Sequence, residues 1–153
     1  MFSIAYDGIG QVPSINQYNL TWNKQSKNSS ESMPVGGGSI GANVWVENND
    51  ILLYAAQGNW FDENNQLLKA GRLRIHISPE TFSERGFSQT LNLEKGHILI
   101  KGKNKGIETS ILIWIDVFHP NLHIDVASNK PCTVSVNYET WSCLLYTSDA
   151  ADD

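Results

Sequence analysis

Apolar and polar side chains alternate along most of this sequence, and that period of two constrains the fold more than any other feature. A half-buried β-strand has this period because its successive side chains point to opposite faces, whereas an amphipathic helix repeats every 3.6 residues. The alternation runs through residues 40–47, 72–77, 91–93, 98–100, 122–127 and 134–138. Residues 108–118 are apolar on both faces, which predicts a long strand in the middle of the fold.

Short polar turns separate these segments. They contain Asn48-Asn49 and residues 94–96, 104–106, 119–121 and 128–131. The Asn-Asn pair suits a primed two-residue hairpin, because asparagine tolerates positive φ. About nine strands joined at regular spacing by such turns are typical of sheets built from hairpins. The sequence therefore predicts an all-β fold, an antiparallel β-sandwich (supersandwich) of about nine or more strands with little helix.

Composition limits the classes of partner. The 153 residues are 41% hydrophobic and 18% charged, which is ordinary for one globular domain. No run approaches the roughly 20 apolar residues that cross a bilayer, so no membrane partner is expected. The formal net charge is −5, whereas a nucleic-acid partner would require a basic face. Cys132 and Cys143 are too few for a disulfide framework or a metal site, and no cofactor is expected.

The two ends of the chain carry separate expectations. Residues 1–7 have no basic segment and no long apolar segment, so they do not form a secretory signal. Either the protein is cytoplasmic, or Met1 is an internal methionine. Residues 143–153 resemble the translation of a transposase adapter used in sequencing libraries, the alternative being a genuine acidic C-terminus. We expect residues 1–142 to be an N-terminal β-sandwich domain truncated at its C-terminal end, followed by a non-native tail.

A glycine-rich stretch, residues 33–41, admits two interpretations. Such loops can cradle phosphates, but they then follow a strand and open a helix. Here a polar loop precedes the glycines and a strand follows them, and no lysine comes after them. The favoured interpretation is that the glycines let the backbone turn sharply and pack closely at the entry to a strand.

Two pairs of titratable residues are candidates for chemical sites. His119 and His123 are four residues apart, but Pro120 and a predicted turn prevent them from sharing a helical face, which argues against a metal site. Asp116 and Asp125 lie on strands joined by one turn, so they could act on sugars as paired carboxylates or serve the structure. The structural role is favoured.

An aromatic loop is the best candidate for ligand binding. Sugar rings stack on indole faces while neighbouring polar groups bond their hydroxyls. Residues 57–64 combine one tryptophan with amide and carboxylate side chains. The predicted substrate-binding residues are Asn59, Trp60, Asp62 and Asn64. The alternative is that Trp60 is buried under its own loop. Trp22, Trp45, Trp114 and Trp141 are assigned to core or inter-domain packing.

Several segments together resemble a known bacterial family. They are residues 18–23, 26–36, 40–47, 67–75 and 78–79, in which Tyr18-Asn19-Leu20-Thr21-Trp22, Met33-Pro34-Val35-Gly36 and Ala42-Asn43-Val44-Trp45 stand out. This order and spacing are similar to the N-terminal part of the domain-of-unknown-function family 5703. A more distant likeness is to glycoside hydrolase family 95, the α-L-fucosidase type. Residues 34–38, Leu91-Asn92-Leu93 and His119-Pro120 carry it, with Gly37 where that family usually has asparagine.

The resemblance implies a β-supersandwich packed in front of an (α/α)6 toroid that supplies the catalytic acid and base. No catalytic residue is therefore assigned to this chain. We expect it to be the non-catalytic N-terminal domain of a periplasmic or secreted glycoside hydrolase-like protein. Its expected partners are the helical toroid of the same parent chain and an oligo- or polysaccharide. The alternative is a stand-alone carbohydrate-binding module.

Overall fold

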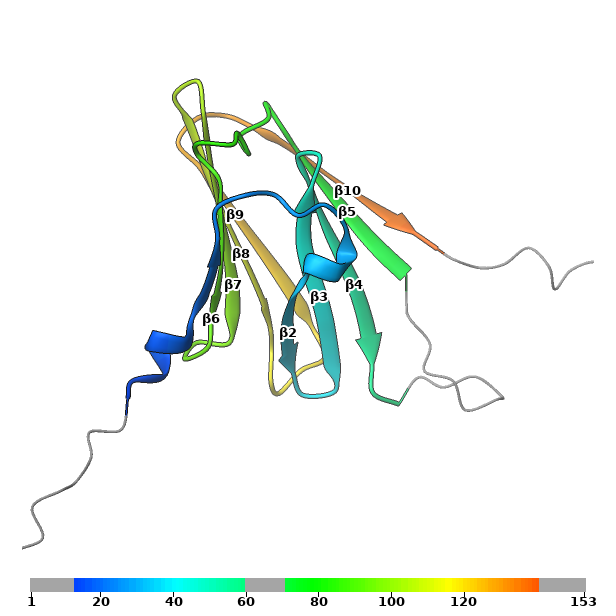
Figure 1. Cartoon of the computed structure of the whole chain (residues 1–153). Helices are drawn as coiled ribbons and strands as arrows, with labels where there is room; N and C mark the ends of the chain where they lie inside the picture. The colour runs from blue at the N-terminus through cyan, green and yellow to red at the C-terminus, as the bar shows by residue number, and fades with distance from the viewer. Residues whose placement is uncertain (1–12, 60–70, 141–153) are drawn as a thin grey trace, which may run out of the picture.

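The computed structural model describes residues 13–59 and 71–140, and within these residues two five-stranded sheets face each other (Figure 1). Sheet A contains, in spatial order, β1 (Leu20–Trp22), β6 (Ser88–Asn92), β7 (His97–Asn104), β8 (Ile107–Ile115) and β9 (Leu122–Ser128). Sheet B contains β10 (Thr133–Glu139), β5 (Gly71–Ser78), β4 (Asp50–Gln57), β3 (Ile40–Glu47) and β2 (Met33–Gly37). All pairs are antiparallel, which confirms the predicted all-β sandwich.

The described helical structure is limited to two short 3-10 turns. These are η1 (Ile15–Tyr18) and η2 (Ser29–Glu31), each preceded by a side-chain cap from Ser14 or Asn28. No helix in the described part of the chain is long and apolar enough to cross a membrane.

The core lies between the sheets and includes the side chains that the alternation placed on one face of their strands. Its fully buried members are Val44, Val46, Ile51, Leu53, Ile75, Ile98, Ile100, Ile111 and Ile113. Complete burial of an aliphatic side chain of this size contributes about 1.5–3 kcal/mol. Polar side chains also enter this layer: Thr109 of β8 is buried on the same face as Ile111, and Gln89 of β6 donates from Nε2 to the Val44 carbonyl oxygen of the facing sheet at 3.1 Å.

Positive backbone φ angles confirm two of the predicted hairpin turns. Asn48 and Asn49 have φ of 51° and 66°, as a type I′ turn between β3 and β4 requires. Lys105 and Gly106 repeat this arrangement between β7 and β8, with φ of 48° and 75°. Both turns follow the right-handed twist of their strands, so they fix the register of two hairpins.

Two boundaries differ from the prediction. Residues 33–37 form strand β2 itself, because Met33 and Val35 alternate into the core and pair with β3. The strand expected over residues 108–118 ends at Ile115, because the next three residues form a turn. This strand, β8, has neighbours on both sides, but its outward residues Leu112 and Trp114 are only half-buried. Their apolar character therefore reflects a partly exposed outer face of sheet A.

Candidate functional site

Three turns meet at one end of the sandwich, at the bottom of Figure 1, and we call them the rim. They are the β2–β3 turn at residues 38–39, the turn after β4 at residues 58–59, and the β8–β9 connection at residues 116–121. The backbone N–H of Gly58 donates to the Ser39 carbonyl oxygen at 2.9 Å, which joins the first two turns.

Glycines allow the third turn to approach the first. A Cβ atom on Gly37 would lie 2.7 Å from the Ile115 carbonyl oxygen, and one on Gly38 would lie 2.8 Å from that of Val117. Such contacts are too short for any side chain, and Gly38 also has a φ of +56°. The close-packing interpretation of the glycine-rich stretch is therefore confirmed at these two positions. The stretch forms a hairpin between two strands, with no helix to complete a phosphate-binding loop.

Asp116 shapes the third turn. Its Oδ1 accepts hydrogen bonds from the backbone N–H of Phe118 at 2.8 Å and of His119 at 3.3 Å, and its Oδ2 lies 2.9 Å from His119 Nδ1. The hydrogen bond from Phe118, followed by that from the His119 ring, lowers the pKa of the Asp116 carboxyl. The turn directs Phe118 into solvent, where it is 89% exposed.

Of the predicted substrate-binding residues, the structure places Asn59 at the rim. It is exposed in the turn that follows β4, and Gln57 beside it donates from Nε2 to Ser39 Oγ at 3.4 Å. Trp60, Asp62 and Asn64 lie outside the described residues, and their assignment stays a prediction.

The two pairs considered as chemical sites serve the structure separately. Asp125 accepts a hydrogen bond from Trp114 Nε1 at 3.1 Å on the outer face of sheet A, whereas Asp116 is occupied by its own turn. His123 stacks on Trp114 with ring centroids 3.9 Å apart. Within residues 13–59 and 71–140, no three His, Cys, Asp or Glu side chains are grouped to hold a metal ion.

The outer face of sheet B carries a charged network that the sequence analysis missed. Arg74 of β5 donates to Asp50 of β4 at 2.6 Å and to Glu139 of β10 at 2.7 Å. Arg72 also pairs with Glu139, and His76 Nδ1 lies 2.8 Å from Asp50. The sequence does contain a signal for this network, because Arg72, Arg74 and His76 alternate and therefore share one face of a strand.

An apolar strip runs along β10 on the side that faces the core. Val134 and Val136 are register partners of the buried Ile77 and Ile75, yet they are 39% and 56% exposed. Sheet A therefore does not cover this edge strand. β10 ends at the same end of sheet B as β4, so the strip runs toward the rim.

A comparison with protein-family models finds a match that covers nearly all residues of the two sheets. The N-terminal model of a family described as "Domain of unknown function (DUF5703)" matches residues 21–148. The chain belongs to the DUF5703 family. The match includes β2 to β10 and most of β1, and it extends through six residues of the segment 143–153 for which a non-native origin is expected. Among curated proteins, none matches this chain. The DUF5703 match defines the family and leaves the activity to be argued from the residues.

Proposed function

We propose that this DUF5703 domain is the non-catalytic N-terminal sandwich of a periplasmic or secreted glycoside hydrolase-like protein. It would pack against an (α/α)6 helical domain of the same parent chain and contribute the rim to a sugar cleft. The distant likeness to glycoside hydrolase family 95 belongs to this proposal, as does the non-native origin of residues 143–153.

The observation that carries the proposal is the composition of the rim. Phe118 is almost fully exposed on a turn fixed by Asp116, and that turn packs against the β2–β3 hairpin at Gly38. Asn59 is exposed on a second turn, which the Gly58–Ser39 hydrogen bond joins to the same β2–β3 hairpin. A large apolar side chain in a fixed position can stack on a sugar ring or fill a pocket on a neighbouring domain. Amide groups beside it can bond sugar hydroxyls.

The β10 strip supports the packing part of the proposal. Val134 and Val136 are apolar, they lie on the core-facing side of their strand, and more than a third of each is exposed. A helical domain that covered the strip would remove this apolar area from water at about 25 cal/mol per Å².

The alternative, a stand-alone carbohydrate-binding module, calls for a row of exposed tryptophans. Trp45 is buried, and Trp22 and Trp114 are half-buried, so the described tryptophans form no such row. The proposal that this domain shares a cleft with a partner domain is therefore better supported than a stand-alone carbohydrate-binding module.

Kinetics of the full parent protein test the cleft. Phe118→Ala, Asn59→Ala and Trp60→Ala should each lower kcat/KM on a susceptible glycan by about ten-fold. The control is Lys24→Ala, next to the Gln25 side chain that accepts from Asn49 in the β3–β4 turn at the opposite end of sheet B, which should leave kcat/KM unchanged. Unaltered turnover and glycan binding in Phe118→Ala and Asn59→Ala would remove the rim from the cleft, and the same result in Trp60→Ala would remove that predicted binding residue.

Domain packing is tested on the same protein by limited proteolysis. Val136→Asp places a charge in the strip and should expose the junction between the domains to cleavage. Asn137→Asp adds the same charge on the opposite face of β10 and should behave as the wild type. Equal protection of both variants would contradict packing through this strip.

A further inference from the structure

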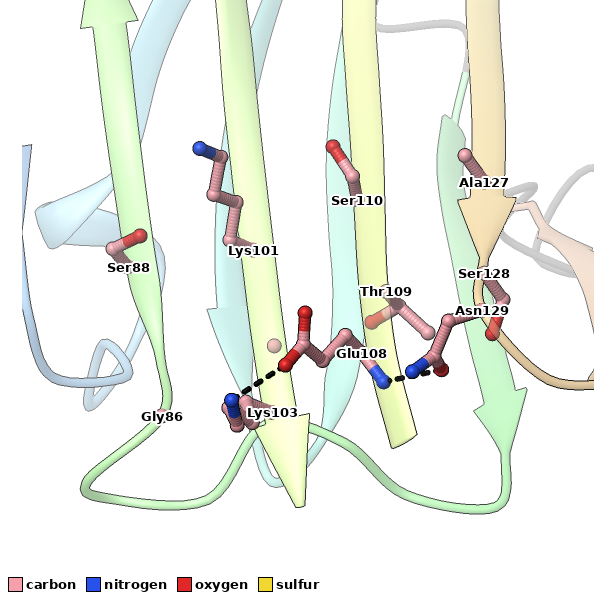
Figure 2. Close-up of a pocket in the computed structure, with 11 residues that line it drawn as sticks. Gly86, Ser88, Lys101, Lys103, Glu108, Thr109, Ser110, Ala127, Ser128 and Asn129 are labelled. Atoms are coloured by element: carbon pink, nitrogen blue, oxygen red, sulfur yellow. Dashed lines mark hydrogen bonds and ion pairs between the residues drawn. The ribbon is translucent and has the colours of Figure 1, made fainter. Parts of the chain in front are cut away.

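A groove of about 550 Å³ lies on the outer face of sheet A, at the end opposite the rim (Figure 2). Four neighbouring strands place one residue each in a row across it: Ser88 of β6, Lys101 of β7, Ser110 of β8 and Ala127 of β9. Adjacent strands are about 4.8 Å apart, so Ser88 and Ser110 bracket Lys101 over about 10 Å.

The polar groups at the centre of this row are free of partners among residues 13–59 and 71–140. The described residues give the Lys101 ammonium no ion pair or hydrogen bond, and the same holds for the hydroxyls of Ser88 and Ser110. An ammonium flanked by two hydroxyls offers donors for an anion and donors or acceptors for neighbouring alcohols.

The floor and walls of the groove are held in place. Glu108 forms an ion pair with Lys103 at 2.5 Å, and its backbone N–H donates to Asn129 Oδ1 at 2.8 Å. The Ser83 hydroxyl donates to the Lys103 carbonyl oxygen at 2.7 Å, and beneath β8 the Thr81 and Thr109 hydroxyls are 2.6 Å apart. Figure 2 shows the first two of these contacts below the row of free groups, between the row and the β7–β8 turn. The free groups are therefore presented by a braced surface.

The local charge is positive although the chain is acidic overall. Lys101, Lys103 and Lys105 alternate along β7 and its turn, and the Lys130 ammonium lies near Gly106 in that same turn. Glu108 neutralises Lys103, while the described ion pairs involve none of the other three lysines. Asp125 lies on β9, two strands away from β7, and its carboxylate accepts a hydrogen bond from Trp114.

The next row of the same face is apolar at its centre. Leu99 of β7 and Leu112 of β8 are register partners and half-buried. A sugar ring combines these requirements, because its C–H face packs on aliphatic carbon while its hydroxyls and an acidic substituent need polar partners.

We propose that this groove binds an acidic sugar residue of a polysaccharide, with Lys101 holding the anionic substituent between the hydroxyls of Ser88 and Ser110. The shared chemistry is a carboxylate or a sulfate on a pyranose. A nucleic acid is disfavoured, because its phosphate backbone requires several basic contacts and the chain carries a net charge of −5. The groove is separate from the rim, so its test does not depend on the proposed cleft.

Binding of the 153-residue chain to three polymers with one backbone tests the proposal. The probes are carboxymethyl dextran, dextran sulfate and unmodified dextran, with a single-stranded DNA oligonucleotide as a polyanion without pyranose rings. At least one acidic dextran should bind, and the tighter of the two identifies carboxylate or sulfate as the preferred group. Unmodified dextran and DNA should bind at least about five-fold more weakly than that polymer.

Two pairs of variants locate the binding. Lys101→Met and Ser110→Asp should weaken binding to the acidic polymer by about five-fold or more, because one removes the ammonium and the other occupies it. Lys95→Met and Asn92→Asp make the same charge changes at the other end of the β6–β7 hairpin and should change binding less than two-fold. All four substituted side chains are exposed or half-buried, so thermal unfolding should confirm that each variant is folded.

Three results would overturn the proposal. Equal losses in Lys101→Met and Lys95→Met would show diffuse attraction to net charge. DNA binding as tight as that of the acidic dextrans would show that the groove does not recognise a sugar. Failure of both acidic polymers to bind would show that the groove is not a binding site for this chemistry.

Discussion

Trp114 lies flat against His123, with ring centroids 3.9 Å apart and planes inclined by 6°. The two residues are register partners on β8 and β9, and the indole is fixed by its hydrogen bond to Asp125. The arrangement has one unfavourable feature, because His123 Nε2 is buried and no described residue forms a hydrogen bond with it. An unsatisfied buried polar atom costs about 1–3 kcal/mol.

We predict that His123→Phe stabilises the domain. Phenylalanine can keep a stacked contact with Trp114 while removing the unsatisfied nitrogen, so the free energy of unfolding should rise by about 1 kcal/mol. Urea denaturation followed by tryptophan fluorescence measures the change. His123→Ala provides the comparison, since it removes the stack as well and should lower stability. If His123→Phe is less stable than wild type, the nitrogen has a partner that contributes to folding.

The β2–β3 hairpin, whose turn belongs to the rim, provides a second prediction. Gly37→Ala should destabilise the domain by about 1–3 kcal/mol, because the new Cβ atom would lie 2.7 Å from the Ile115 carbonyl oxygen. Gly41→Ala is the matched control on the next strand, where a Cβ atom meets nothing within 4 Å. That change should be neutral or stabilising by a few tenths of a kcal/mol. Similar losses at both positions would indicate that the close approach to β8 is unimportant.

The elements that the sequence predicted best are those specified by neighbouring residues. Ile40, Ala42, Val44 and Val46 needed only the period of two, and the Asn48-Asn49 turn needed only the tolerance of asparagine for positive φ. The prediction placed Phe118 inside a strand, because apolar residues continue past Ile115. The turn-forming bonds of the Asp116 carboxylate end that strand, and the alternation does not reveal them.

The two surface features depend on pairing between distant strands. Arg74 and Glu139 are 65 residues apart, and only the β5–β10 register brings them together. Similarly, Ser88, Lys101 and Ser110 form a row because three strands pair in one register. Local periodicity also gives Val136 the same pattern as Ile75, although no facing sheet covers Val136. These relationships required the tertiary structure.

The β3–β4 turn provides a third prediction. Asn48 has a φ of 51°, which a β-branched side chain adopts at a cost of about 1–2 kcal/mol. Asn48→Val should therefore lower the free energy of unfolding by that amount. Asn48→Gly should be neutral or slightly stabilising, since glycine adopts positive φ readily. Thermal and urea unfolding of the two variants check this, and equal stability would mean that the turn changes conformation to accommodate valine.

The charged network on sheet B predicts sensitivity to acid. Hydrogen bonds from Arg74 and then Arg72 lower the pKa of Glu139 below its ordinary value of 4.5. For Asp50, burial acts to raise the pKa, but hydrogen bonds from His76 and Arg74 outweigh it and lower the pKa below 3.8. A carboxyl group with a lowered pKa in the folded state binds fewer protons there than in the unfolded chain. Its stabilising contribution is complete above the ordinary pKa and is lost as the pH falls through the lowered value.

We therefore expect the free energy of unfolding to fall as the pH is lowered from about 5 to 3, with part of that fall caused by Glu139. Glu139→Gln should be less stable than wild type at pH 7, because Arg72 and Arg74 lose a charged partner, and its stability should fall less steeply in acid. Glu84→Gln removes an exposed carboxylate outside the network and should follow the wild-type curve. Urea unfolding at a series of pH values measures these slopes. Parallel curves for Glu139→Gln and wild type would show that the paired arginines do not favour the ionised form of Glu139 in the folded state.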